Sequence, residues 1–410
     1  MSFKKKSAVF FLTVILLFGA GFGAEALWAP YVNDDSSTYD GLVIGAFAVG
    51  ADGVDVITEH MVYALTAKGQ VLLNAVDNTT ENDDEVVGVG GGGLRYDNGS
   101  VRIFADRVRV GLRYYYNEYR DTSMEAANLE NYIGRGYAFG YLDENERFVP
   151  FDEDAWTDET KITMRPIGEK GIGVYVTGTE DLLFAMENTG ASQYLAVHPL
   201  SDGPDALTWF SGRRYYGDFA YAILGNDKVS VVNCVPLESY VQGVCAGEVG
   251  GGFPAEALKA QAVAARSYVM YHITLGDYQY SSGFDLTSDD WSQVYHGYTD
   301  SEAIRSAVAA TENQYLTYNG RVISAMYSAA DGGETLNSED VFPSTLPYLR
   351  GVKDPYEAAA ATDLRLNVAG SHRVGMSQCG AYAMAKYYGK TYKDILGFYY
   401  TNVGISYGYR

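Results

Sequence analysis

Apolar residues in the first half of the chain fall in short runs that are separated by turn-forming residues. Runs of this length, rich in Val, Tyr and Phe and bounded by Gly, Asn and Asp, are typical of β-strands. The pattern predicts a β-rich N-terminal module of unknown role over residues 27–206, which begins with an acidic, turn-rich segment to about residue 56. The expected strands lie near 42–49, 101–104, 108–115, 137–141, 174–177 and 194–197.

The pattern changes near Leu207, where helical spacing of apolar residues joins the short strand-like runs. Apolar residues at every third or fourth position predict amphipathic helices, and Pro254 suits the first turn of one of them. The expected elements are a hairpin around 225–227, helices at 254–274, 377–388 and about 391–400, and a strand or helical turn at 241–245. The fold class is therefore expected to be α+β, with a mixed α/β domain of the catalytic type at 207–410 behind the β-rich module.

The first 26 residues have the pattern of an export segment. Three lysines, at positions 4 to 6, precede an apolar run over 8–24, and Ala24-Glu25-Ala26 is a small-x-small cleavage pattern. The run fits either a cleaved signal peptide or a retained N-terminal membrane anchor. Both alternatives place the rest of the chain outside the cytoplasm, either secreted or anchored to the membrane.

Composition narrows the function classes. The formal net charge of −22 disfavours nucleic acid as a partner, because a chain this acidic repels phosphate backbones. Cys234, Cys245 and Cys379 form no C-x-x-C pair, and each lies in an apolar stretch. They are expected to be buried thiols rather than parts of a disulfide scaffold or a metal site.

Several blocks of the second half carry the chemistry. The first contains Ala246-Gly247-Glu248, and the last contains Val374-Gly375-Met376-Ser377-Gln378. In order and spacing these blocks closely resemble the signature of the stage II sporulation protein D and amidase-enhancer family. The resemblance covers about 207–410 and does not extend to the N-terminal half. The matching blocks are 233–249, 253–268, 292–295, 327–335, 347–352 and 374–381.

The resemblance implies a peptidoglycan lytic transglycosylase whose acid/base is Glu248. Glycosidic cleavage needs a carboxyl group with a raised pKa that protonates the leaving oxygen. Glu248 follows an apolar stretch and precedes Gly250-Gly251-Gly252, which adds no bulk to a groove. A lytic transglycosylase needs one such group, because the sugar's own 6-hydroxyl closes a 1,6-anhydro ring and the same Glu serves both steps. No cofactor is expected.

Other matching residues are expected to bind substrate or to support the site. They are Arg266, Gln293, Tyr295, Ser328, His372, Ser377 and Gln378. Arg266 is expected either to contact Glu248 or to buttress the fold, and His372 either to position substrate or to be a hydrogen-bonded structural histidine. Glu238 is a rival carboxylate, but its place at the start of a helix favours a structural role.

Three departures from the family pattern bear on activity. Arg373 stands where relatives usually have Gly, and Cys379 where they usually have Tyr. Some relatives have Cys and His in the segment that corresponds to 283–292, which resemble a zinc site; this chain has neither residue there, so no bound metal is expected. Only about sixteen residues separate Tyr356 from His372, where relatives usually have several more strands, and the shortening affects one wall of the expected groove.

The leading hypothesis is cleavage of peptidoglycan glycan strands between N-acetylmuramic acid and the next sugar, during spore engulfment. The rival is a non-enzymatic wall-binding module that activates a partner N-acetylmuramoyl-L-alanine amidase. The shortened segment and Arg373 favour the rival, whereas the intact Glu248 block favours the enzyme. A structural envelope protein with a degenerate domain is a third possibility. The expected partners are glycan strands and a cell-wall amidase.

Overall fold

The computed structural model describes residues 93–131, 134–201, 207–275 and 283–410, together with four strands in the first 56 residues. Those strands form one antiparallel sheet: β1 (Ile15–Leu16), β2 (Ala24–Trp28), β3 (Ile44–Gly50) and β4 (Gly53–Val56). β3 covers the strand expected near 42–49. Most of the expected export segment lies outside the described residues. No helix in the described part of the chain has the length and apolar character needed to cross a membrane.

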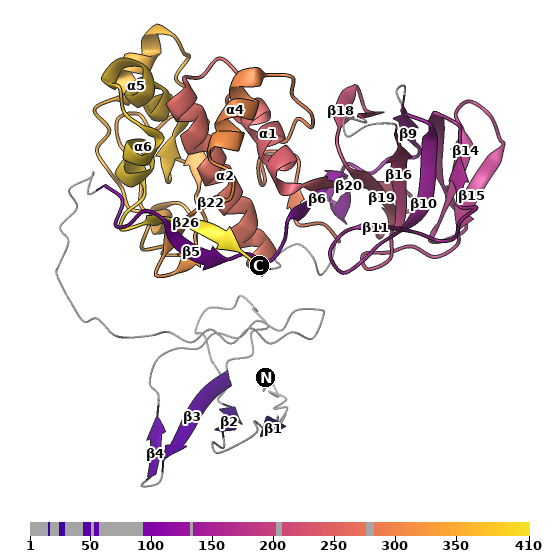
Figure 1. Ribbon diagram of the computed structural model, residues 1–410, viewed down its shortest axis with the longest axis horizontal. Coiled ribbons are helices and arrows are strands. Elements are labelled where there is room, and N and C mark those ends of the chain that lie inside the picture. The colour runs from indigo at the N-terminus through magenta and orange to yellow at the C-terminus, as the bar shows by residue number, and fades with distance from the viewer. Residues whose placement is uncertain are drawn as a thin grey trace, which may run out of the picture. The chain divides into compact units, whose positions relative to one another are not determined.

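The chain divides into two compact units, Met1–Glu85 and Val86–Arg410. The second unit contains a strand-rich part and a helical part, and β6 and β20 lie where the two meet (Figure 1). Its largest sheet has eight strands, of which β21 alone runs parallel to its neighbour β6. In order across the sheet the strands are β11 (Phe148–Pro150), β10 (Gly136–Leu142), β16 (Leu195–Leu200), β19 (Asp218–Ile223), β20 (Val229–Pro236), β6 (Arg107–Arg113) and β21 (Leu286–Thr287), with β12 (Trp156–Thr157) paired to β10.

A second, six-stranded antiparallel sheet packs against the first. Buried side chains of both sheets, such as Met164 and Val174 of one and Phe219 and Val231 of the other, belong to one hydrophobic cluster. β19 and β20 are buried along almost their whole length, and β13 and β14 along part of theirs, so the two sheets share one core. The second sheet consists of β15 (Leu182–Met186), β14 (Gly171–Val176), β13 (Lys161–Ile167), β9 (Ala127–Glu130), β17 (Thr208–Phe210) and β18 (Arg213–Tyr215), and a separate hairpin is formed by β7 (Tyr115–Asn117) and β8 (Arg120–Asp121).

The helical part is built around α2 (Ala255–Leu275). The expected stripe of this helix, Leu258 to Val269, lies in the large core that it shares with the sheets, while Ala260 and Val263 face a second core. A helix that is apolar on both sides is buried between layers. The other helices are α1 (Leu237–Glu248), α4 (Glu302–Ala310), α5 (Gln378–Tyr388) and α6 (Tyr392–Tyr399), with short 3-10 turns η1 (Ser338–Asp340) and η2 (Glu357–Thr362).

Most expected elements of the second half are present. The hairpin is β19–β20, the helix at 254–274 is α2, and the capping pair before the last helix forms a full capping box. The ambiguous segment 241–245 is helical and belongs to α1. α4 was not expected, since its nine residues give only a short apolar pattern.

Among the described residues of the second unit, two smaller sheets contain the remaining strands. One consists of β23 (Arg321–Val322), β22 (Gln314–Tyr318), β26 (Gly404–Tyr409) and β5 (Gly99–Arg102), and the other of β24 (Tyr327–Ser328) and β25 (Met376–Ser377).

The expected boundary near Leu207 does not coincide with a division of the structure. β6 pairs with β20 and β21 in the largest sheet, and β5 pairs in parallel with the C-terminal strand β26. Strands expected to belong to the N-terminal module therefore complete sheets of the C-terminal part. The hydrophobic pattern predicts strands but not their partners, because pairing over more than 100 residues leaves no local signal.

Candidate active site

The carboxylate of Glu248 lies at the C-terminal end of α1. Gly247, the residue next to the last of the helix, and Gly243, about one turn before it, face the backbone of residues 294–297. A Cβ atom at Gly247 would lie 2.3 Å from the carbonyl oxygen of Val294, and one at Gly243 would lie 2.4 Å from that of Gly297. Only glycine allows this approach. The two glycines of this block therefore bring the end of α1 against the 294–297 segment.

This approach gives Glu248 its partners. The backbone N–H of Val294 donates to Oε1 at 2.8 Å, and Nε2 of Gln378 donates to Oε2 at 3.3 Å. Burial raises the pKa of Glu248, although hydrogen bonds from Val294, Gln378 and Tyr327 oppose the rise. The side chain remains partly exposed. A half-buried carboxyl group with a raised pKa suits general acid catalysis.

The glycines that follow Glu248 leave space beside it. A Cβ atom at Gly250 or Gly252 would meet no atom within 4 Å, and Gly251 and Gly252 are exposed. A Cβ atom at Gly251 would lie 2.3 Å from the hydroxyl oxygen of Ser301, so of the three glycines Gly250 and Gly252 border open space. This agrees with the absence of bulk that the sequence indicates there.

Gln293 and Tyr295 flank Val294 and are buried, with 1% and 2% of their surface exposed. Gln293 donates to the hydroxyl of Tyr327 at 2.8 Å and accepts from the hydroxyl of Tyr240 at 3.0 Å. The Tyr295 hydroxyl donates to Oδ1 of Asn233 at 2.9 Å. These contacts fix the segment that presents the Val294 N–H, so both residues support the site from behind.

Arg266 lies in the core and does not contact Glu248. Its side chain is fully buried, and Nε and Nη2 donate to the two carboxylate oxygens of Glu238 at 2.8 and 2.6 Å. Nη1 donates to the carbonyl oxygens of Ala262 and Gln314. Of the two roles left open by the sequence, this geometry fits the structural one. The fork-to-fork pair joins the start of α1 to α2.

Ser328, Ser377 and Gln378 meet at the short parallel pair of β24 and β25, where Ser328 lies opposite Ser377. The Ser377 hydroxyl accepts from the N–H of Gly380 at 2.9 Å and so caps α5. It also donates to Oε2 of Glu357 at 2.6 Å. Ser377 therefore fixes the start of the helix whose first residue, Gln378, reaches Glu248.

His372 and Arg373 precede β25. Nδ1 of His372 accepts from the N–H of Val374 at 3.0 Å, and burial lowers the pKa of this imidazole. The contacts fit a hydrogen-bonded structural histidine. Arg373 has a φ of 63°, a left-handed conformation that glycine adopts without strain. Its guanidinium donates to the carbonyl oxygens of Asp331 and Glu334, which offsets part of the cost of the side chain.

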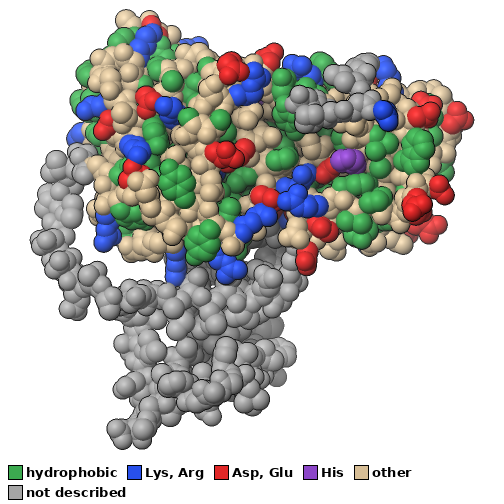
Figure 2. Space-filling view, viewed as in Figure 1, with side chains coloured by type: hydrophobic (Ala, Val, Ile, Leu, Met, Phe, Trp, Pro, Cys, Tyr) green, Lys and Arg blue, Asp and Glu red, His purple; other side chains and the backbone are tan. Residues whose placement is uncertain are grey.

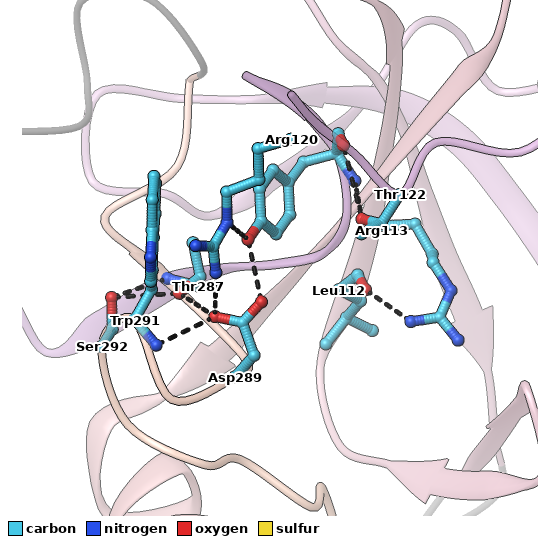
Figure 3. A network of polar contacts seen from close by, with 9 residues as sticks. Leu112, Arg113, Arg120, Thr122, Thr287, Asp289, Trp291 and Ser292 are labelled. Atoms are coloured by element: carbon cyan, nitrogen blue, oxygen red, sulfur yellow. Dashed lines mark hydrogen bonds and ion pairs between the residues drawn. The ribbon is translucent and has the colours of Figure 1, made fainter. Parts of the chain in front are cut away.

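The segment 283–292, where some relatives have zinc ligands, is held by a polar network instead (Figure 3). The carboxylate of Asp289 accepts from the Tyr114 hydroxyl at 2.9 Å, from Arg120 at 2.9 Å and from Thr287 at 2.7 Å. The Arg120 guanidinium also stacks over the Trp291 ring. The ion pair between Arg120 and Asp289 therefore joins this segment to β8. The absence of bound zinc stays a prediction.

A cavity of about 300 Å³ lies beside this network. Arg113, Arg213, Phe210 and Asp289 are among the residues that line it. On the face drawn in Figure 2, acidic side chains gather toward the end that carries β14 and β15, and elsewhere both signs are interspersed with hydrophobic side chains. No pattern in the sequence predicts the cavity of about 300 Å³, because its walls come from segments that are distant along the chain.

Comparison with known proteins matches residues 225–318 to the stage II sporulation protein family model. An uncharacterised protein of Brachyspira hyodysenteriae is 41% identical over 35% of this chain and 38% of its own length. Stage II sporulation protein D of Bacillus subtilis is 33% identical over 39% of this chain and 52% of its own length. The amidase enhancer of the same organism is 36% identical over 31% of this chain and 17% of its own.

These matches confirm the resemblance seen in the sequence blocks. The chain spans about half or less of the length of each of these relatives. The matched residues include all of α1 and α2. They therefore contain Glu248, the glycines that bring α1 against residues 294–297, and the buried ion pair of Arg266 with Glu238. The C-terminal region of this chain therefore contains a domain of the stage II sporulation protein family.

Proposed function

We propose that this protein acts on the bacterial cell wall in sporulation and cleaves peptidoglycan glycan strands as a lytic transglycosylase, with Glu248 as the acid and base. The supporting observation is the environment of Glu248. It is a half-buried carboxyl group with a raised pKa, no cationic partner among the described residues, and hydrogen bonds from Val294, Gln378 and Tyr327. A carboxyl group of this kind remains protonated to higher pH than an ordinary glutamate.

The reaction needs two proton transfers at one carboxyl group. Protonated Glu248 donates its proton to the glycosidic oxygen, and the bond to the anomeric carbon of N-acetylmuramic acid breaks. The resulting carboxylate then takes the proton of the 6-hydroxyl as that oxygen closes the 1,6-anhydro ring, which restores the acid. Val294 and Gln378 hold the carboxyl group in place through both steps. The open side at Gly250 and Gly252 admits the strand.

Hydrolysis would instead need a second carboxylate placed to activate water. Among the described residues, Asp290 is the acid whose charge acts on Glu248, and it is exposed. Asp354 is buried with its oxygens bound by other groups, and Glu334 pairs with Lys353. Asp290 is therefore the first candidate for a water-activating group if the products turn out to be those of hydrolysis.

A second candidate function is activation of a partner cell-wall amidase without glycan cleavage. The observation in its favour is the similarity to a relative named amidase enhancer. In this case the surface around Glu248 would bind wall or partner, and its proton would play no part. Both functions require export, which we propose on the basis of the Lys4–Lys6 and 8–24 pattern.

The deciding experiment is mass analysis of the products of purified glycan strands, with and without a cell-wall amidase. Cleavage to 1,6-anhydro ends supports the transglycosylase, and cleavage to reducing ends indicates hydrolysis. Uncut strands together with a faster amidase would establish the activator instead. The matched variant is Glu248→Gln, which keeps the shape of the side chain and removes the transferable proton.

A further inference from the structure

A second group of carboxylates lies apart from Glu248, on the other side of Ser377. Asp331, Asp354 and Glu357 are 0%, 5% and 1% exposed. One oxygen atom of each lies within 4.8 Å of the others. Asp331 follows β24, Asp354 precedes η2, and Glu357 is the first residue of η2. Three buried acids therefore converge from two separate segments of the chain, since Asp354 and Glu357 lie in one turn.

Two of the three carboxylates are firmly oriented by donors. Glu357 accepts from the backbone N–H groups of Asp331 and Gly332 at 2.5 and 2.8 Å and from the Ser377 hydroxyl. Asp354 accepts from the N–H of Tyr356 at 2.7 Å and from the Tyr399 hydroxyl at 2.6 Å. These contacts fix where the oxygens point, but they do not neutralise the charge.

Asp331 differs from the other two. Its Oδ1 accepts from the N–H of Gly333 at 2.7 Å, whereas its Oδ2 is buried and has no hydrogen-bond partner. Among the described residues no Lys or Arg side chain forms an ion pair with any of the three acids, and Arg373 donates to the main-chain carbonyl of Asp331 instead. Burial, repulsion from Asp354 and Glu357, and a hydrogen bond that protonated Asp331 makes with Asp354 raise the pKa of Asp331 to about 8.

A buried carboxylate oxygen without a partner carries a high desolvation cost, and two neighbouring carboxylates increase it. A cation removes both costs at once. Hard divalent ions prefer carboxylate oxygens, and calcium binds them at about 2.3–2.6 Å. Oxygens within 4.8 Å of one another are close enough to contact one such ion from different sides.

We propose that Asp331, Asp354 and Glu357 form a binding site for a hard divalent cation, with calcium as the best fit. Asp331 Oδ2 supplies the free ligand atom, and the other two acids supply one oxygen each. The ion ties η2 to β24 and, through the bond from Ser377 to Glu357, to the start of α5. The site is independent of whether Glu248 performs catalysis.

The test uses the full chain, freed of metal with a chelator. Calcium titration by calorimetry should show one site, and the Tm should rise with calcium concentration. Asp331→Asn removes the charge of the free ligand and should weaken calcium affinity roughly tenfold or more. Glu334→Gln is the control, because Glu334 lies nearby in sequence but pairs with the exposed Lys353; it should leave affinity unchanged.

A second readout does not depend on a variant that folds. Terbium replaces calcium in oxygen sites, and excitation of Tyr399, whose hydroxyl bonds to Asp354, should sensitise its emission until calcium displaces it. The opposite result would be no calcium heat, no terbium signal and the same Tm in calcium as in chelator. That result would overturn the proposal and indicate that Asp331 instead carries a proton shared with Asp354.

Discussion

Glu238 and Glu248 lie at the two ends of the same helix, α1, and have opposite surroundings. Glu238 is in the first turn, where the helix dipole favours a carboxylate, and it forms a bidentate pair with the buried Arg266. Glu248 is the last residue, where the dipole disfavours a negative charge. Its partners are the backbone N–H of Val294, the amide of Gln378 and the hydroxyl of Tyr327, and none of them carries a charge.

The difference shows how one helix can carry one acidic residue that stabilises the fold and another that is suited to proton transfer. Glu238 pairs through both oxygens with the permanent cation of Arg266, so its carboxylate serves to join α1 to α2. Glu248 is left without a cation in a partly desolvated position, and burial raises its pKa. A change at Glu238 should therefore affect stability, whereas a change at Glu248 should affect chemistry.

The largest effect should follow from Glu248→Gln. Loss of a positioned acid typically lowers a rate by about 10²–10⁴-fold, and the amide keeps nearly the same shape. Glycan cleavage, measured by release of 1,6-anhydro products, should fall by that amount while the Tm changes little. Full cleavage by the variant would show that Glu248 takes no part in the chemistry, and the functional half of the contrast between Glu238 and Glu248 would then be wrong.

Arg266→Ala tests whether the ion pair at the start of α1, between Arg266 and Glu238, stabilises the fold. Removal of one partner from a buried ion pair costs about 3–5 kcal/mol; because the Glu238 side chain is 29% exposed, we expect the lower part of that range. Denaturant unfolding of the full chain should show the loss. Arg305→Ala is the matched control, since Arg305 pairs with Glu302 on the exposed side of α4. A variant with wild-type stability would show that the pair does not hold α1 to α2.

How far the sequence predicts this arrangement differs between the two ends of α1. The Glu248 block, the capped helices α5 and α6 and the central helix α2 carry local signals, and the structure contains them. The Arg266–Glu238 pair and the pairing of β6 with β20 depend on residues distant along the chain, so the pattern leaves them open. The clustering of Asp331, Asp354 and Glu357 was not predicted, because three separate acids give no motif.

Gly247→Ala leaves Glu238 and Glu248 unchanged and tests whether the contact between α1 and Val294 is needed for activity. Its Cβ would lie 2.3 Å from the Val294 carbonyl oxygen, so the 294–297 segment must move away from α1. A shift of about 1 Å at a catalytic group can cost on the order of 10²-fold in rate. Gly190→Ala is the control, because a Cβ there meets nothing within 4 Å and the residue lies in the connection between β15 and β16. Equal activity of both variants would separate the Val294 contact from catalysis.

The smallest effect concerns pH. Because burial raises the pKa of Glu248, the folded protein holds this proton more tightly than the unfolded chain does. The free energy of unfolding should therefore fall as pH rises from about 4.3, the ordinary glutamate value, through the raised value of the folded state. Cleavage by the protonated acid should decline over the same upper range.

Glu248→Gln should flatten this part of the stability curve, and the difference between variant and wild type isolates it from other groups. Asp331, whose pKa is raised to about 8, contributes a falling slope of its own from about pH 4 to about pH 8 in both proteins, and this slope cancels in the difference. Unfolding measured between about pH 4 and pH 8 therefore checks the raised pKa without any assay of activity. A difference that does not vary with pH would mean that Glu248 titrates as an ordinary glutamate, and the contrast between the two ends of α1 would then rest on the cation at Glu238 alone.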